Sequence, residues 1–151
     1  MSEIVSMDFS SDHLHLRPQA DTILGLLGNY IFPTDRNALY AEEEGETFGA
    51  FVDEGSNARR LVGLSFLRYV SDNEINRPHG LVVALAVDWR YQEKGLGSAL
   101  LYAAEKSTAE EGLNLIAVPP DQDSTRLGDL GRFFISHGYT KNQAGIYTKE
   151  I

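Results

Sequence analysis

The chain has 151 residues, of which 42% are hydrophobic and 10% aromatic, and it contains no cysteine. Its 22 acidic residues outnumber its 13 basic residues, which gives a net charge of −9 at pH 7. This length predicts one domain, residues 1–151, that is large enough to have its own core. The lack of cysteine excludes disulfides, thiolate metal sites and a cysteine acyl-enzyme, and the acidic balance argues against a nucleic-acid partner.

No apolar run has the length of a membrane span, and the N-terminus has no charged-then-apolar signal pattern. We therefore expect a cytoplasmic protein with no membrane partner. The surplus of acidic residues is most often a solvated surface, and the alternative is that it attracts a cationic co-substrate such as an amine.

The first third of the chain predicts one strand and two helices. Alternating polar and apolar residues over 13–17 predict a strand, and its His13 and His15 have no evident third ligand, so we predict no metal site. Asp21 is placed to cap a helix, whose inner face carries Ile23, Leu24, Leu27, Tyr30 and Ile31. A break at residues 33–35 begins a second short helix that runs to about Glu43.

The middle of the chain predicts three strands. Residues 47–52 and 61–70 alternate in polarity, and the turn formers between them predict a hairpin with Val62, Leu64 and Phe66 on one face. The unbroken apolar run at 81–87 predicts a buried central strand.

The last third predicts two helices and two strand regions. A helical pattern runs from Ser98 to about Glu111, and a strand follows over 113–118. Asp123 or Ser124 can cap a last helix, which contains Leu127, Leu130, Phe133 and Phe134 and ends at Gly138. Residues 139–149 form a closing strand region with a turn near 144–145.

A glycine turn joins the central strand to the following helix, with the sequence Gln-x-x-Gly-x-Gly at residues 92–97. A turn of this kind points backbone N–H groups and the positive end of a helix dipole at one place, which suits a pyrophosphate. Gly95 and Gly97 lack a Cβ, so an anion can approach the backbone, and Lys94 adds a positive charge. A dinucleotide fingerprint would need a third glycine at Leu100, and a P-loop Gly-Lys-Ser/Thr is absent. The alternative is an ordinary turn whose glycines only relieve crowding.

Between a buried strand and a helix, this motif resembles the acyl-CoA loop of the GNAT superfamily of N-acetyltransferases. The predicted order β-α-α-β-β-β-α-β-α-β is similar to that of the family, and so is the ending from Phe133 to Tyr139. The resemblance implies an α/β (α+β) fold with a central mixed, mostly antiparallel sheet, splayed central strands and about four flanking helices.

The resemblance also implies that acetyl-CoA is a co-substrate and that no metal is needed. The pantetheine arm would lie in the gap between the splayed strands and bond to the main chain at about Leu85, Ala86 and Val87. A backbone N–H near Ala86 or Val87 would stabilise the oxyanion. The pyrophosphate would lie over Gln92, Glu93, Lys94, Gly95, Leu96, Gly97 and Ser98.

The family's usual catalytic acid, a tyrosine on the last helix, is replaced here by Phe134, which cannot donate a proton. An asparagine common at the start of that helix is absent near Leu127. A thiolate leaves without much help near neutral pH, and Tyr139, Ser136 or a water are alternative donors. For Tyr139 a role as a core aromatic is favoured over the role of acid.

The general base is equally open. Arg90 stands where relatives often place a glutamate, and Asp88 is more typical of a residue that caps a turn. His79, at the start of the central strand, has a suitable intrinsic pKa, but a hydrogen-bonded surface or loop histidine is the favoured alternative. We expect His137 to offset the dipole at the end of the last helix.

The resemblance predicts direct transfer of an acyl group to a small-molecule amine or a peptide amine. Glu43, in the acidic run at 42–46, is a candidate residue for binding the acceptor, against the alternative of a solvated loop. Dimerisation is common in the family, so a homodimer is among the expected partners, although the sequence shows no interface pattern. The alternative function is an acyl-CoA-binding module with little turnover that regulates a partner protein.

Overall fold

The structure is a computed structural model, which describes residues 2–24, 30–31, 45–53, 55, 59–71, 77–91, 95–119 and 127–151. In this part of the chain the strands are β1 Ser2–Met7, β2 Tyr30–Ile31, β3 Gly45–Asp53, β4 Arg59–Val70, β5 His79–Val87, β6 Leu115–Val118, β7 Thr140–Lys141 and β8 Tyr147–Glu150. The α-helices in the same part are α1 Arg17–Leu24, α3 Leu96–Glu110 and α4 Leu127–Ser136, with short 3₁₀ turns at Leu14–Leu16 and Trp89–Tyr91.

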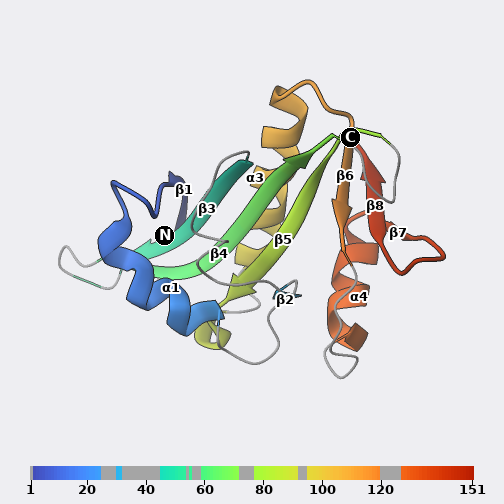
Figure 1. The fold of residues 1–151 in the computed structure, drawn as a ribbon. Coiled ribbons are helices and arrows are strands. Elements are labelled where there is room, and N and C mark those ends of the chain that lie inside the picture. Colours follow the sequence, from blue (N-terminus) through green and yellow to red (C-terminus); the bar gives the residue numbers. More distant parts are fainter. Residues whose placement is uncertain are drawn as a thin grey trace.

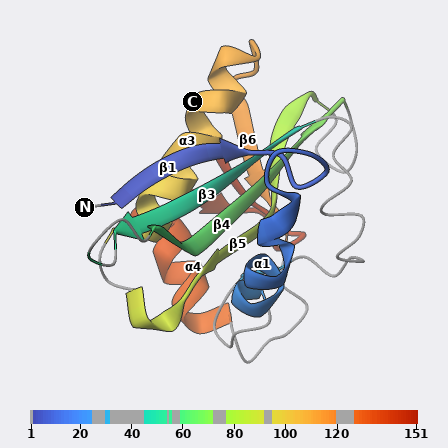
Figure 2. The same cartoon turned by 90° about the vertical axis from the view of Figure 1, so that its left-hand side faces the viewer.

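All eight strands belong to one sheet, in the order β1-β3-β4-β5-β6-β8-β7, with β2 added beside β5 (Figure 1). The β5–β6 pair is parallel and the other pairs are antiparallel. Helix α1 covers one face of the sheet, and α3 and α4 cover the other (Figures 1 and 2). The expected mixed, mostly antiparallel GNAT-like fold is therefore confirmed. The helix expected to end near Glu43 lies outside the described residues.

Two apolar cores lie on the two faces of the sheet. The core beneath α3 and α4 contains residues of both helices and of five strands, and the smaller core beneath α1 contains fully buried Phe66 and Leu24. The β3–β4 pairing skips Val62, which therefore packs beneath α3 while Leu64 and Phe66 face α1. The prediction that these three side chains share one face is wrong, because a bulge reverses the alternation of the strand.

The N-terminal prediction also needs correction, since residues 13–17 do not form a strand. Leu14–Leu16 is a 3₁₀ turn, and the preceding residues close a tight turn in which the His13 backbone N–H donates to the Asp8 carbonyl oxygen at 2.8 Å. The first strand is instead β1, paired with β3. Helix α1 begins at Arg17, so Asp21 lies inside it and is not its cap.

Tyr30 and Ile31, predicted on the inner face of the first helix, instead form β2 beside β5, because their backbone pairs with that strand edge. The other elements that the structure describes agree with prediction. The β3–β4 hairpin, the buried β5 strand, α3, β6 and α4 all appear within a few residues of their expected bounds. The closing region is a β7–β8 hairpin, in which Gly145 has a φ of +84°.

A short turn built on Asp88 links β5 to the segment before α3. The Asp88 backbone N–H donates to the Val62 carbonyl oxygen at 2.8 Å, and its Oδ1 accepts the Arg90 backbone N–H at 3.1 Å. Its Oδ2 accepts the Arg90 Nη2–H at 2.8 Å, and the carboxylate is nearly buried. The expectation that Asp88 caps this turn is confirmed. Hydrogen bonds from Arg90 are the main cause that lowers the pKa of the Asp88 carboxyl below its ordinary value of 3.8, against the opposing effect of burial.

We expect Asp88→Asn to lower the free energy of unfolding at pH 7 by about 1–2 kcal/mol, the range for a charge-assisted hydrogen bond to a half-exposed guanidinium. A carboxyl whose pKa is lower in the folded protein stabilises it above the ordinary pKa, and that contribution is lost as the pH falls through the folded pKa. The difference between the native protein and the variant should therefore shrink below pH 3.8. Urea unfolding at pH 7 and pH 3 measures it, and an equal difference at both values would contradict the ion pair.

Candidate functional site

The sheet opens between β5 and β6. These parallel strands pair only at Gly80–Ile116 and Leu81–Ala117, and Figure 1 shows them diverging beyond that point. β5 continues to Val87, and its pairing with β4 skips Val83, which marks a bulge inside the diverging part. The expected splay of the central strands is therefore confirmed.

The chain's own β2 lies at the edge of β5 that faces this gap. β4 pairs along one edge of β5 over its whole length, so the antiparallel pairs Tyr30–Leu85 and Ile31–Ala84 use the opposite edge. The β2 pairing ends at Leu85, one residue before Ala86. Of the main-chain positions expected to meet pantetheine, Leu85 is thus paired within the chain.

The N-terminus of α3 lies at the end of β5 beyond the Asp88 turn. Gly95 is its N-cap residue, in the left-handed conformation with φ of +78°, which only glycine adopts without strain. The first N–H groups of an α-helix have no partner inside the helix, so they are available to an anion. Leu96 is buried in the core and holds the helix in place. Gln92, Glu93 and Lys94 lie outside the described residues.

Gly97 lies in the first turn of α3, against α4. A Cβ built on Gly97 would lie 3.5 Å from the nearest ring atoms of Phe133, which is ordinary van der Waals contact. The described residues therefore leave room for a methyl group here, and packing among them does not explain the glycine.

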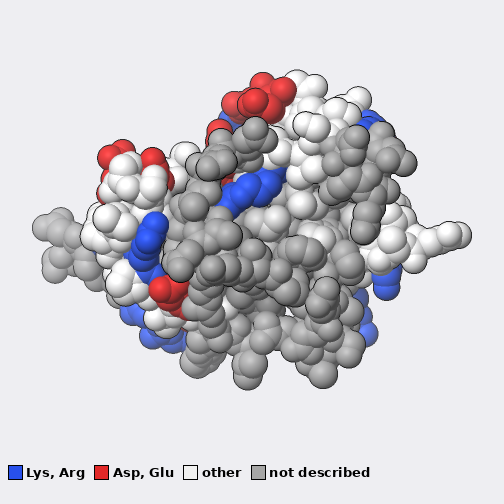
Figure 3. Space-filling model, in the orientation of Figure 1, with Lys and Arg blue, Asp and Glu red and all other residues white. Residues whose placement is uncertain are grey.

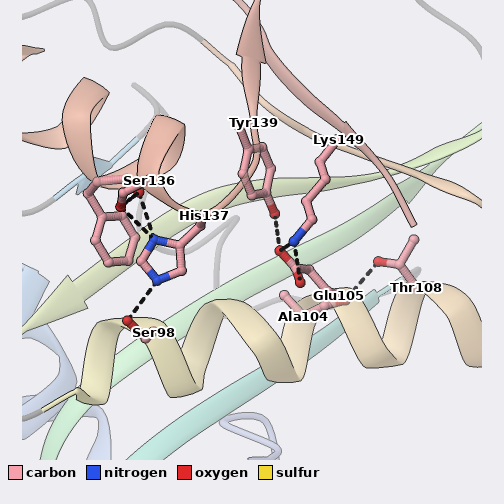
Figure 4. A network of polar contacts seen from close by, with 9 residues as sticks. Ser98, Ala104, Glu105, Thr108, Ser136, His137, Tyr139 and Lys149 are labelled. Atoms are coloured by element: carbon pink, nitrogen blue, oxygen red, sulfur yellow. Dashed lines mark hydrogen bonds and ion pairs between the residues drawn. The ribbon is translucent and has the colours of Figure 1, made fainter.

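Ser98 and His137 connect the start of α3 to the end of α4 (Figure 4). Ser98 Oγ lies 2.8 Å from His137 Nε2, and His137 Nδ1 lies 2.7 Å from the Phe133 carbonyl oxygen. Both side chains are partly buried. The structure thus places His137 beside the candidate anion site as well as at the C-terminal end of its own helix.

Phe134 is buried in the core between α4 and the sheet. It is 1% exposed, and its ring contacts the rings of Tyr139 and Tyr147 at centroid distances of 5.7 and 5.6 Å. A hydrocarbon ring in this place fills the core and supplies no proton.

The Tyr139 hydroxyl is hydrogen-bonded to a partly buried carboxylate, that of Glu105. It donates to Glu105 Oε2 at 2.8 Å, and Lys149 Nζ lies 3.2 Å from the other oxygen of Glu105 (Figure 4). Burial and then the charge of Glu105 raise the pKa of the Tyr139 phenol. This arrangement suits a core aromatic that links α3 to the C-terminal strands.

Tyr147 is a phenol that the sequence patterns did not single out. It is 6% exposed, and its hydroxyl oxygen lies 2.7 Å from the position that a Cβ on Gly131 would have, so the helix needs glycine there. Among the described residues its hydroxyl has no hydrogen bond, although buried tyrosines usually have one. Tyr147 pairs with Val118 at the end of β6, so it lies one strand away from the gap between β5 and β6.

His79 lies at the opposite end of β5. It is completely buried, its Nδ1 lies 2.7 Å from the Arg77 carbonyl oxygen, and its Nε2 has no partner within the described residues. Six residues of strand separate His79 from Leu85, about 20 Å at the usual rise. This separation does not suit direct proton transfer near Leu85. Glu43 lies outside the described residues.

Among the described residues, no group of three or more His, Cys, Asp or Glu side chains is arranged to hold a metal ion. Within the same residues, no helix is both long and apolar enough to cross a membrane.

Comparison with known proteins completes the description of the site. The sequence profile of the acetyltransferase (GNAT) family matches residues 8–131. No curated protein sequence matches the chain. The fold is similar to that of the ribosomal-protein-S18-alanine N-acetyltransferase from Escherichia coli, with a TM-score of 0.70 and 18% identity over 100% of this chain and 94% of that one.

Two further solved structures have the same fold. An acetyltransferase of the GNAT family from Staphylococcus aureus Mu50 gives a TM-score of 0.70 at 16% identity, with 99% of each chain covered. A chain of the KacTA–DNA complex gives 0.65 at 16% identity, over 99% of this chain and 93% of that one. The glycine turn, the open strand edge and a family profile that spans most of the sequence together show that this chain belongs to the acetyltransferase (GNAT) family.

Proposed function

We propose that this protein binds acetyl-CoA and transfers its acetyl group directly to the amine of a small molecule or a peptide. The observation that carries the proposal is the place of the α3 N-terminus, which follows the diverging end of β5 and is capped by Gly95 in the left-handed conformation. A site for acyl-CoA must hold the diphosphate anion and must hold the extended arm. The α3 N-terminus is suited to the anion, and the β5 edge is suited to the arm. The pairing of Leu85 with β2 implies that the arm meets the edge at Ala86 and Val87, or displaces β2.

The charge distribution supports an anionic donor in spite of the net charge of −9. Exposed Glu110 and Glu111 lie at the C-terminal end of α3, where Figure 3 shows an acidic patch at the top of the molecule. A helix of 15 residues is about 22 Å long, so this patch lies far from the N-terminal turn. We expect no nucleic-acid partner on account of this acidic balance, although the chain of the KacTA–DNA complex has the same fold.

The chemistry that we propose is a single transfer within a ternary complex. The neutral amine attacks the thioester carbonyl and its nitrogen forms the new amide bond. The C–S bond breaks, its electron pair leaves on sulfur as the CoA thiolate, and the nitrogen loses one proton to solvent. The chain has no cysteine that could form a cysteine acyl-enzyme. A peptide amine is a reasonable acceptor because the neighbour from Escherichia coli, a ribosomal-protein-S18-alanine N-acetyltransferase, shares the fold over the whole chain. A small-molecule amine is the other class.

A regulatory acyl-CoA-binding module is the second candidate function. It is favoured by Phe134, which removes the phenol from α4, and by the β2 pairing at the edge of the gap. Release of free thiol from acetyl-CoA in the presence of amino acids, polyamines, aminoglycosides or peptides supports the enzyme. Tight CoA binding without thiol release in the whole panel supports the module.

We expect Gly97→Val to weaken CoA binding at least tenfold, because its branched side chain would occupy the approach of the pyrophosphate to the backbone. Gly97→Ala is the matched control, since the structure has room for one methyl group against Phe133. Isothermal titration with CoA measures the affinity, and thermal unfolding checks that both variants are folded. Equal affinities in the native protein and a folded Gly97→Val variant would place the anion elsewhere.

We expect turnover to rise with pH as the acceptor amine loses its proton, without a falling limb near pH 8–9, because Phe134 supplies no acid. Phe134→Tyr should raise the rate if its new hydroxyl reaches the sulfur. The pH profiles of Tyr147→Phe and Tyr139→Phe are the comparison, since Tyr139 donates to Glu105 and the Tyr147 hydroxyl has no hydrogen bond among the described residues. A falling limb in the native enzyme that Tyr147→Phe removes would instead identify Tyr147 as the proton donor.

A further inference from the structure

The hydrogen bonds around His137 define which of its nitrogens carries a proton. Nδ1 lies 2.7 Å from the Phe133 carbonyl oxygen, and a carbonyl only accepts hydrogen bonds, so Nδ1 carries a hydrogen. In the neutral ring Nε2 therefore has a lone pair. Ser98 Oγ lies 2.8 Å from Nε2, so the Ser98 hydroxyl must donate its hydrogen to His137 in this state.

This direction of donation matters because Ser98 lies in the first turn of α3. The backbone N–H groups of that turn favour an anion, yet a Ser98 hydroxyl that donates to His137 presents only lone pairs to it. A proton on Nε2 reverses the bond. The protonated ring then donates to Ser98 Oγ, and the hydroxyl hydrogen is released toward the anion.

We propose that His137 is a positioning residue that takes up a proton when the acyl-CoA diphosphate binds, and that the protonated ring turns the Ser98 hydroxyl toward the diphosphate. This inference rests on the proposed function, because it requires CoA at the α3 N-terminus. The one bond that forms is the N–H bond at His137 Nε2, and its proton comes from solvent.

The surroundings of His137 support a charged ring. It lies at the C-terminal end of α4, where the helix dipole favours a cation, and its ring lies 4.4 Å from that of Phe133 between centroids. The charged groups that Figure 4 draws, Lys149 of β8 and Glu105 of α3, form an ion pair with each other at 3.2 Å, about two helical turns along α3 from Ser98. The neighbour of His137 on its other nitrogen is Ser136, whose Oγ lies 3.1 Å from Nδ1.

The proposal predicts that CoA affinity and His137 protonation are linked. Between pH 8 and pH 6 the native protein should bind CoA more tightly as the pH falls, by at most tenfold per pH unit for one proton. His137→Gln should lose the part of this pH dependence that comes from the protein, because its amide N–H donates to Ser98 without titrating. Ser98→Ala should lack it as well, whereas Ser136→Ala should keep it, since the Phe133 carbonyl still holds Nδ1.

The experiment is isothermal titration of CoA at several pH values, in two buffers of different ionisation enthalpy. The native protein and Ser136→Ala should take up a fraction of a proton, and His137→Gln and Ser98→Ala should take up less. Protonation of CoA itself is common to all four proteins and is removed by taking differences. Thermal unfolding checks that each variant is folded.

A second measurement needs no variant. The ring signals of the chain's four histidines are followed by NMR as a function of pH with and without CoA. The titration midpoint of His137 should move to higher pH when CoA is bound. CoA binding with an unchanged midpoint, or with equal proton uptake in the native protein and His137→Gln, would overturn this inference while leaving the proposed function intact. Absence of CoA binding at every pH would overturn both.

Discussion

Backbone pairing between β5 and β6 stops after two residue pairs, and the geometry of the site follows from that early stop. The N–H and C=O groups of a strand edge need partners, and a buried edge without them is costly. Beyond Leu81 the β5 edge no longer meets β6, so it must find other partners. In this chain two of those positions pair with β2, and the rest of the edge lies next to the Asp88 turn.

The split divides the sheet into two parts that must be held together in another way. The larger part, β1 to β5, is followed in the chain by α3. The smaller part consists of β6, β7 and β8, and α4 lies between β6 and β7 in the chain. Contacts of α3 with α4 and with the residues just after α4 bridge the two parts. They include the Ser98–His137 bond, the Glu105–Tyr139 bond and the packing of Phe133 on Gly97. Because α3 begins at the candidate anion site, the same contacts that stabilise the split also orient its first turn.

The aromatic residues at this junction differ in role: some only fill the core, and others also carry a hydroxyl. Phe134 and Tyr139 fill the core, and the Tyr139 phenol donates to the partly buried carboxylate of Glu105. Tyr147 presents a hydroxyl against Gly131, where a larger residue would not fit. Phe134 thus packs in the core without a hydroxyl, and the transfer that we propose would rely on the thiolate as a good leaving group.

Local patterns in the sequence determined the main strands, the two C-terminal helices, the glycine turn and the capping role of Asp88, because each depends on residues close in the chain. The GNAT-like order could be predicted for that reason, whereas the left-handed conformation of the Gly95 N-cap is seen only in the structure. Tertiary structure alone decided the rest. The bulge at Val62 moved a side chain to the other face, and residues 13–17 became a turn because Asp8 offered their backbone closer partners than a distant strand did. The Ser98–His137 bond, the Glu105–Tyr139 bond and the β2 pairing join residues far apart in sequence, and only packing across the divided sheet brings them together.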